Sequence, residues 1–80
     1  MAKQRVKLDF NPELVPRPII YEIGQRFRVV TNIRRADVGE EHGWVILELE
    51  GDDDEIERSL QWAGDQGVHV TSVEGDIIAG

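Results

Sequence analysis

The side chains that could do acid–base or metal chemistry in this chain are two histidines and a run of acids. His42 falls in a polar connection and His69 in a short alternating stretch, and neither has a carboxylate or histidine at metal-ligand spacing. The acidic run, 52–55, lacks the glycine turn and the distant bidentate glutamate of a calcium loop. Acids there suit the positive N-terminus of a helix, with Asp52 or Asp53 as its cap. The sequence therefore predicts no metal site.

No other set of residues has the types and spacing of an enzyme site. Gly39 and Gly43 flank acidic residues, which repel phosphate, and neither Ser59 nor Ser72 lies in a nucleophile motif. The chain has no cysteine, which excludes a disulfide scaffold, cysteine zinc sites and cysteine-ligated iron–sulfur clusters. We expect a protein that is not an enzyme and needs no cofactor.

One residue, Asn32, is unusual for its position. It lies in the middle of a predicted strand, where asparagine is disfavoured. Its side chain offers two donor hydrogens and an acceptor oxygen, which suits an amide-like or amino-acid ligand. The alternative interpretation is an exposed strand asparagine, or one bonded to a neighbouring loop.

Charge and length limit the possible partners. Sixteen acidic and nine basic side chains give a net charge of −7, which argues against nucleic acid and against anionic membrane surfaces. The N-terminus has no apolar segment after its first charges, and no run approaches the roughly 20 apolar residues that span a bilayer. We expect a cytoplasmic protein, not inserted in a membrane, with one domain over 1–80, a core over about 5–73 and a frayed tail at 74–80.

Hydrophobic periodicity predicts the elements that position these residues. Alternation of period two predicts strands over 5–10, 28–38, 44–50 and 68–73, and helical spacing predicts helices over 19–27 and 53–66. The order strand, helix, strand, strand, helix, strand is typical of an α+β, ferredoxin-like βαββαβ sandwich. In this fold both helices cover one face of a four-stranded antiparallel sheet.

The other face of this sheet is expected to be open and half apolar. Trp44 and Ile46 should lie on it, near Val30 and Asn32 of the neighbouring strand. A domain this small buries only roughly 60% of its unfolded surface, so we expect a homodimer, with sheets stacked face to face or joined edge to edge. Scattered surface hydrophobics are the alternative interpretation.

Many weakly specific positions, in the correct order, resemble a known family. They are Val6-Lys7-Leu8-Asp9-Phe10, Pro18-Ile19-Ile20, Asn32-Ile33, Ala36-Asp37-Val38, 43–51, Ile56, Leu60 and 67–70. From 6 to 73 the chain resembles the NIL domain, which is named for an Asn-Ile-Leu tripeptide. Here the tripeptide is Asn32-Ile33-Arg34, and the charge of Arg34 would make a pocket at that position more polar and favour an anionic group.

The resemblance implies a ferredoxin-like, ACT-like domain of the kind found at the C-terminus of methionine-import ABC transporter ATPase subunits. There such domains pair and bind methionine, and the motif asparagine, here Asn32, takes part. NIL domains are also fused to iron–sulfur ferredoxins linked to sulfur assimilation. This chain carries neither an ATPase nor cluster cysteines, so any regulation is expected to act on a separate transporter or sulfur-pathway protein.

From these arguments we predict a non-catalytic regulatory domain. Its expected ligand is methionine or a related sulfur amino acid, bound at a dimer interface. The candidate ligand-binding residues are Asn32, Ile33, Arg34, Val30 and Trp44. The alternative is a protein-interaction subunit in sulfur assimilation or iron–sulfur-linked sulfur transfer.

Overall fold

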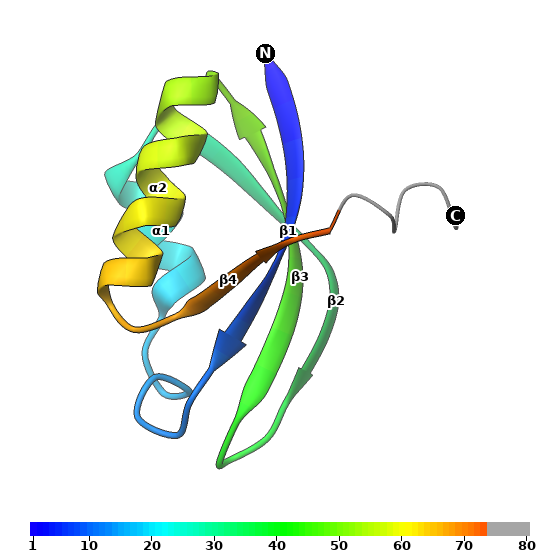
Figure 1. Ribbon diagram of the computed structural model, residues 1–80, viewed down its shortest axis with the longest axis vertical. Coiled ribbons are helices and arrows are strands. Elements are labelled where there is room, and N and C mark those ends of the chain that lie inside the picture. The colour runs from blue at the N-terminus through cyan, green and yellow to red at the C-terminus, as the bar shows by residue number, and fades with distance from the viewer. Residues whose placement is uncertain (74–80) are drawn as a thin grey trace.

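The chain folds as the sequence predicts, in the order strand, helix, strand, strand, helix, strand. The structure is a computed structural model and describes residues 1–73, so the frayed tail expected at 74–80 lies outside the described residues. The elements are β1 (Ala2–Phe10), α1 (Ile19–Arg26), β2 (Val29–Val38), β3 (Gly43–Gly51), α2 (Asp53–Asp65) and β4 (His69–Ser72). All neighbouring strands are antiparallel in the order β2-β3-β1-β4, and Figure 1 shows both helices on one face. This confirms the ferredoxin-like arrangement.

The hydrophobic core fills the space between the sheet and the two helices. Every second residue of β3 is buried, because alternate side chains of a strand point to the same face. Ile19 and Ile23 of α1 and Ile56 and Ala63 of α2 close the core from the other side. Ser59 is also fully buried, and its hydroxyl donates a hydrogen bond to the carbonyl of Ile56 at 2.7 Å. A polar residue therefore fits the buried stripe of α2 by bonding its own helix.

The acidic start of α2 stabilises the fold differently from the expected side-chain cap. Asp52 occupies the N-cap position, but its side chain makes no capping hydrogen bond. Glu55 instead accepts a hydrogen bond from the backbone N–H of Arg28 at 2.8 Å. The first turn of α2 is thereby tied to the connection between α1 and β2.

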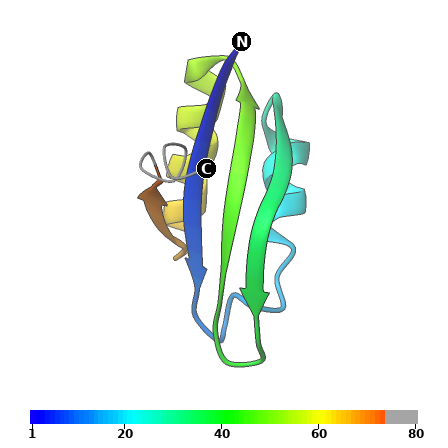
Figure 2. The same cartoon turned by 90° about the vertical axis from the view of Figure 1, so that its right-hand side faces the viewer.

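The two edge strands differ in length and shape. Figure 2 shows β2 at one edge and the much shorter β4 at the other, beside only part of β1. The β2–β3 ladder is irregular between Ile33 and Arg35, which marks a β-bulge. Neither helix within residues 1–73 is long and apolar enough to cross a membrane.

Candidate functional site

Two of the predicted site residues lie side by side on the open face of the sheet, at one end of β2. Val30 pairs with Glu50 of β3, and Asn32 pairs with Glu48. Both Val30 and Asn32 are exposed. The amide of Asn32 therefore lies among carboxylates, near an exposed apolar side chain.

Trp44 does not lie near Asn32, which corrects the expectation that the two are neighbours on the open face. In the β2–β3 ladder Trp44 pairs with Asp37, whereas Asn32 pairs with Glu48. Trp44 and Glu48 lie on the same face of β3, with Ile46 between them. At a rise of about 3.4 Å per residue, the four residues from Trp44 to Glu48 span roughly 14 Å. Trp44 and Asn32 therefore belong to different ends of the open face.

The bulge separates the remaining two candidates. Ile33 pairs with Leu47 and so points to the helix side of the sheet, opposite to Asn32. Arg34 falls within the register shift and has no partner residue in the ladder between β2 and β3. The Asn32-Ile33-Arg34 tripeptide thus presents its side chains in different directions from one edge strand.

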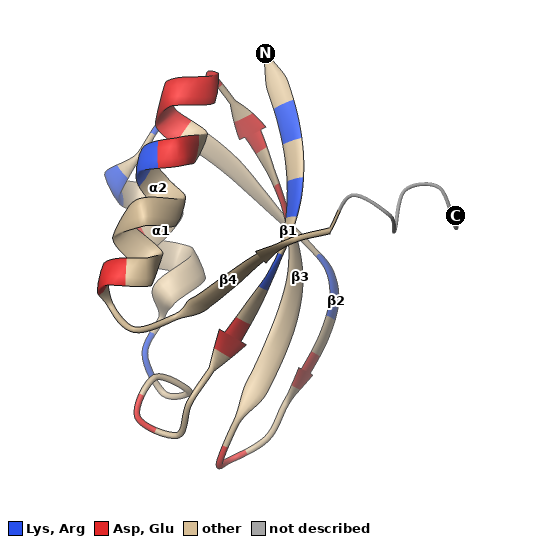
Figure 3. Ribbon diagram, in the orientation of Figure 1, with Lys and Arg blue, Asp and Glu red and all other residues tan. Residues whose placement is uncertain are grey.

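The open face carries more charge than the expected half-apolar surface. Lys3 pairs with Glu50, and Arg5 lies 3.4 Å from the carboxylate of Glu48. Lys7 places its ammonium 5.5 Å from the ring centroid of Trp44. Figure 3 shows the basic bands along β1 beside the acidic end of β3. Opposite charges therefore lie opposite one another on β1 and β3 of this face, and Arg5 and Glu48 form an ion pair.

An apolar groove opens on the helix side of β2. It has a volume of about 260 Å³ and is lined by the end of β1, the segment that leads into α1, the first turn of α1, β2 and the start of β3. The apolar side chains that line it include Phe10, Val15, Ile19, Ile20, Ile33 and Val38. Of the predicted site residues, only Ile33 lines this groove.

Arg17 is the one charged side chain among the described residues that line this groove. Its guanidinium donates to the side-chain oxygen of Gln66 at 3.0 Å and lies 3.8 Å from a carboxylate oxygen of Glu22. Tyr21, which is 66% exposed, also lines the groove. The groove thus combines an apolar floor with a single cation at its wall.

Most of the groove residues could not be identified from the sequence. Phe10, Ile19 and Ile20 were assigned to a strand and a helix, but periodicity does not show which ends of those elements lie together. The available signal was Pro16 and Pro18 in front of α1, which restrict the backbone of the connection that leads into the helix. Tyr21, next to the apolar stripe of α1, was a second signal.

Each histidine lies near acidic residues: His42 lines a surface pocket with Asp37, Glu40 and Glu41, and His69 pairs with Asp9 in the sheet. His42 lies in the β2–β3 connection and His69 begins β4. Within residues 1–73 no three His, Cys, Asp or Glu side chains converge on one point. The arrangement of the described residues therefore offers surfaces for binding more readily than groups for chemistry.

Comparison with known proteins places this fold and this sequence in one family. A family model described as the NIL domain matches residues 4–72. The C-terminal domain of an ABC transporter ATP-binding protein from Enterococcus faecalis has a similar structure, with a TM-score of 0.77 and 21% sequence identity. That match covers 89% of this chain and 83% of the other. No curated protein matches the sequence. Because the family model spans nearly the whole of the described structure, the chain belongs to the NIL domain family.

Proposed function

We propose that this chain is a non-catalytic regulatory domain that binds methionine or a related sulfur amino acid at the β2 edge of its sheet. The observation that supports this function best is the apolar groove beside β2, which contains Ile33 of the family tripeptide and one cation, Arg17. A thioether side chain suits the apolar floor, and a carboxylate suits a guanidinium.

The size of the groove favours a ligand of this kind. Pockets for drug-sized molecules measure about 300–1,000 Å³. The groove beside β2 measures about 260 Å³, so it suits a ligand with one short apolar chain. Arg17 lies at the wall of the groove, where its guanidinium would exchange the weak contact with Glu22 for the ligand's carboxylate.

The positions of Asn32 and Ile33 suggest that the ligand lies across the strand edge. Their side chains point to opposite faces of the sheet. A ligand in contact with both must therefore reach from the groove around the outer edge of β2. Arg34, in the bulge that directly follows Ile33, is close enough along the chain to add a second cation for a carboxylate.

The same edge is the better surface for a second copy of the chain. Stacking two open faces would remove the paired charges of β1 and β3 from water, and burying ion pairs is costly. Among the described residues β2 has a strand neighbour on one side only, and Val30, Ile33 and Val38 are each more than half exposed. Bringing two β2 edges together would cover these side chains, with the ligand lying between the two edges.

The regulatory part of the proposal rests on the family and on the structural neighbour. The NIL domain matches over 4–72, and the similar structure is a C-terminal domain of a transporter ATP-binding protein. We therefore propose a transporter subunit as the protein that this domain regulates. A sulfur-pathway protein is the alternative partner, but no contact or charge of the described residues favours it specifically.

The test is calorimetry and thermal denaturation with methionine and homocysteine. Binding to the folded state raises the free energy of unfolding by about 2.7 kcal/mol when the free ligand is at 100 times its Kd. Replacing Asn32 with alanine should weaken binding by roughly tenfold or more, since a hydrogen bond to a charged group contributes about 1.5–3 kcal/mol.

The matched control for Asn32→Ala is Gln25→Ala. Gln25 carries the same amide, is exposed, and lies near the end of α1 away from the groove. Binding should be unchanged in that variant. If neither amino acid shifts the unfolding transition of the wild-type chain, the proposed ligand class is wrong, and equal heats for Asn32→Ala and wild type would remove Asn32 from the site.

A further inference from the structure

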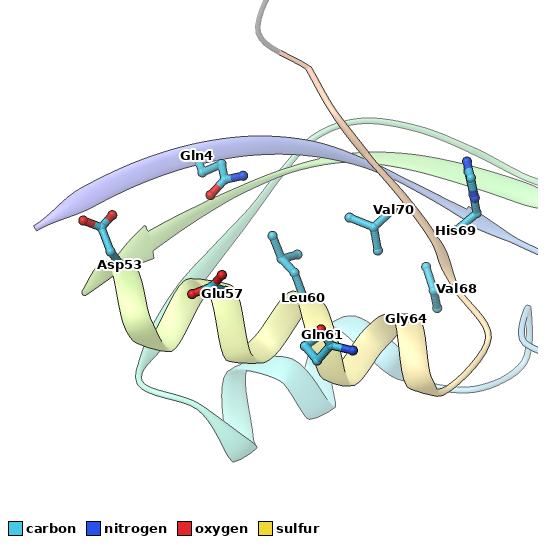
Figure 4. A pocket seen from close by; sticks show the side chains of 9 residues that line it. All are labelled: Gln4, Asp53, Glu57, Leu60, Gln61, Gly64, Val68, His69 and Val70. Carbon is cyan, nitrogen blue, oxygen red and sulfur yellow. The ribbon is translucent and has the colours of Figure 1, made fainter.

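A second groove, of about 630 Å³, lies on the same helix-covered side of the sheet but toward the opposite edge, between α2 and the strands β1 and β4. Figure 4 shows its residues: Asp53 and Glu57 of α2 lie at one end near Gln4 of β1, while Leu60 and Val70 lie between the helix and the strands. The groove thus has an acidic end and an apolar middle.

One wall of this groove is a stretch of strand edge with which no other described strand pairs. β4 pairs with β1 only from Val6 to Asp9, and the backbone N–H of Val73 adds one further hydrogen bond, to the carbonyl of Arg5. From Ala2 to Gln4, β1 pairs with β3 but with no other described strand. Backbone donors and acceptors of an unpaired edge bind a further extended segment readily.

The charge of the groove selects the kind of segment that fits. Among the side chains lining it, Asp53 and Glu57 are acidic and none is lysine or arginine. Neither acid forms an ion pair with a described residue, and they lie one helical turn apart, where like charges destabilise a helix. A cation placed between them would relieve this repulsion.

We propose that this groove binds an extended, basic segment of a partner protein, which adds a strand along Ala2–Gln4. A lysine or arginine of the segment pairs with Asp53 and Glu57, and an apolar side chain packs against Leu60. Alternate residues of a strand reach the same face, so a single extended segment supplies both contacts. This inference is independent of the ligand proposed at β2.

Residues 74–80 of the chain itself are a poorer match for the groove. The register of Val6 with Ser72, continued past Val73, would place Glu74 level with Gln4 and Asp76 level with Ala2. Gln4 lines the groove, so both acids would point toward Asp53 and Glu57. Repulsion between like charges therefore favours a basic segment from another protein.

The test is fluorescence anisotropy with the full-length chain and a labelled peptide, Thr-Val-Thr-Lys-Thr-Lys-Thr. A second peptide with the reversed sequence is tested as well, because the added strand can run in either direction. The lysine peptide should saturate, and a peptide with glutamate in place of lysine should not. Asp53→Asn combined with Glu57→Gln should weaken binding on the order of fivefold, as two exposed ion pairs are lost. The control, Glu40→Gln with Glu41→Gln in the β2–β3 connection, removes the same charge and should change binding by less than about twofold, because distant charges are screened.

Amide shifts in the nuclear magnetic resonance spectrum locate the peptide. Shifts should be largest in Ala2–Gln4 and along α2. Absence of saturable binding, equal loss in both double variants, or shifts concentrated in β2 would overturn the proposal. Cross-strand contacts between residues 74–80 and Ala2–Gln4 in the free chain would identify the chain's own segment as the occupant and would also overturn it.

Discussion

Gly51 lies where three strands and the connection before β2 pack so closely that there is no room for a Cβ atom. Gly51 ends β3, pairs with Ala2 on one side and with Val29 on the other, and is buried. An alanine Cβ there would lie 2.7 Å from the backbone carbonyl oxygen of Arg28. We expect Gly51→Ala to lower the free energy of unfolding by about 1–3 kcal/mol, the usual cost of overpacking.

Gly24→Ala is the matched control for this substitution. Gly24 lies inside α1, and a Cβ there meets no atom within 4 Å. Because alanine is favoured over glycine in helices, this variant should gain roughly 0.5–1 kcal/mol. Urea denaturation of both variants measures the two changes, and an unchanged midpoint for Gly51→Ala would show that β3 and the Arg28 backbone move apart easily.

The residue scale also shows what the sequence could and could not predict at the candidate site. Alternation placed Asn32 and Ile33 on opposite faces, as the ladder has them. It could not place Arg34, because a bulge adds one residue to a strand without changing the type of any side chain. The distance between Trp44 and Asn32 depends on the register of β2 with β3, which the length of the connection does not determine uniquely.

At the scale of elements, α2 is held to the rest of the fold by one carboxylate as well as by its buried stripe. Glu55 accepts from the backbone N–H of Arg28 and also from the guanidinium of Arg58, each at 2.8 Å. We expect Glu55→Ala to destabilise the fold by about 1–2 kcal/mol, as one charge-assisted hydrogen bond to the backbone is lost. The control is Asp54→Ala, which removes the same charge from the same turn, so the helix-dipole contribution cancels.

Thermal denaturation of Glu55→Ala and Asp54→Ala measures the difference in stability between the two variants. Asp54 makes no side-chain hydrogen bond to a described residue, so its loss should cost a few tenths of a kcal/mol through the dipole alone. Equal transition temperatures for the two variants would mean that the acidic run acts only through its charge, as the sequence suggested. This contact was not predictable, because residues 28 and 55 are distant in the sequence and only the fold brings them together.

For the whole molecule, the order of the elements was predictable and the grooves were not. Periods of 2 and 3.6 in the apolar residues indicate strands and helices locally, and the βαββαβ order then leaves few arrangements. A groove arises where elements fail to cover one another, such as where β4 is shorter than β1. Such gaps depend on lengths and packing that a single sequence does not specify.

At the scale of the whole molecule, the association of two chains tests whether the β2 edge is the interface of the proposed dimer. A lysine on an exposed edge strand opposes pairing with a second edge, because its charge must stay in water. Ile33→Lys should therefore shift the proposed dimer toward monomer, with at least a roughly tenfold rise in the dimer dissociation constant, as one buried apolar side chain contributes about 1.5–3 kcal/mol. Analytical ultracentrifugation over a range of concentrations measures that constant.

His69→Lys is the matched control, because His69 is exposed on β4, at the opposite edge of the sheet, and faces Asp9. That variant should associate like the wild type. A dimer that survives Ile33→Lys but dissociates in His69→Lys would place the contact at β4, and a wild-type chain that stays monomeric would leave the β2 groove open on its outer side. If Ile33→Lys weakens association and His69→Lys does not, the β2 edge lies at the boundary between the two copies. Only in that case do both copies enclose a ligand that lies across the β2 edge.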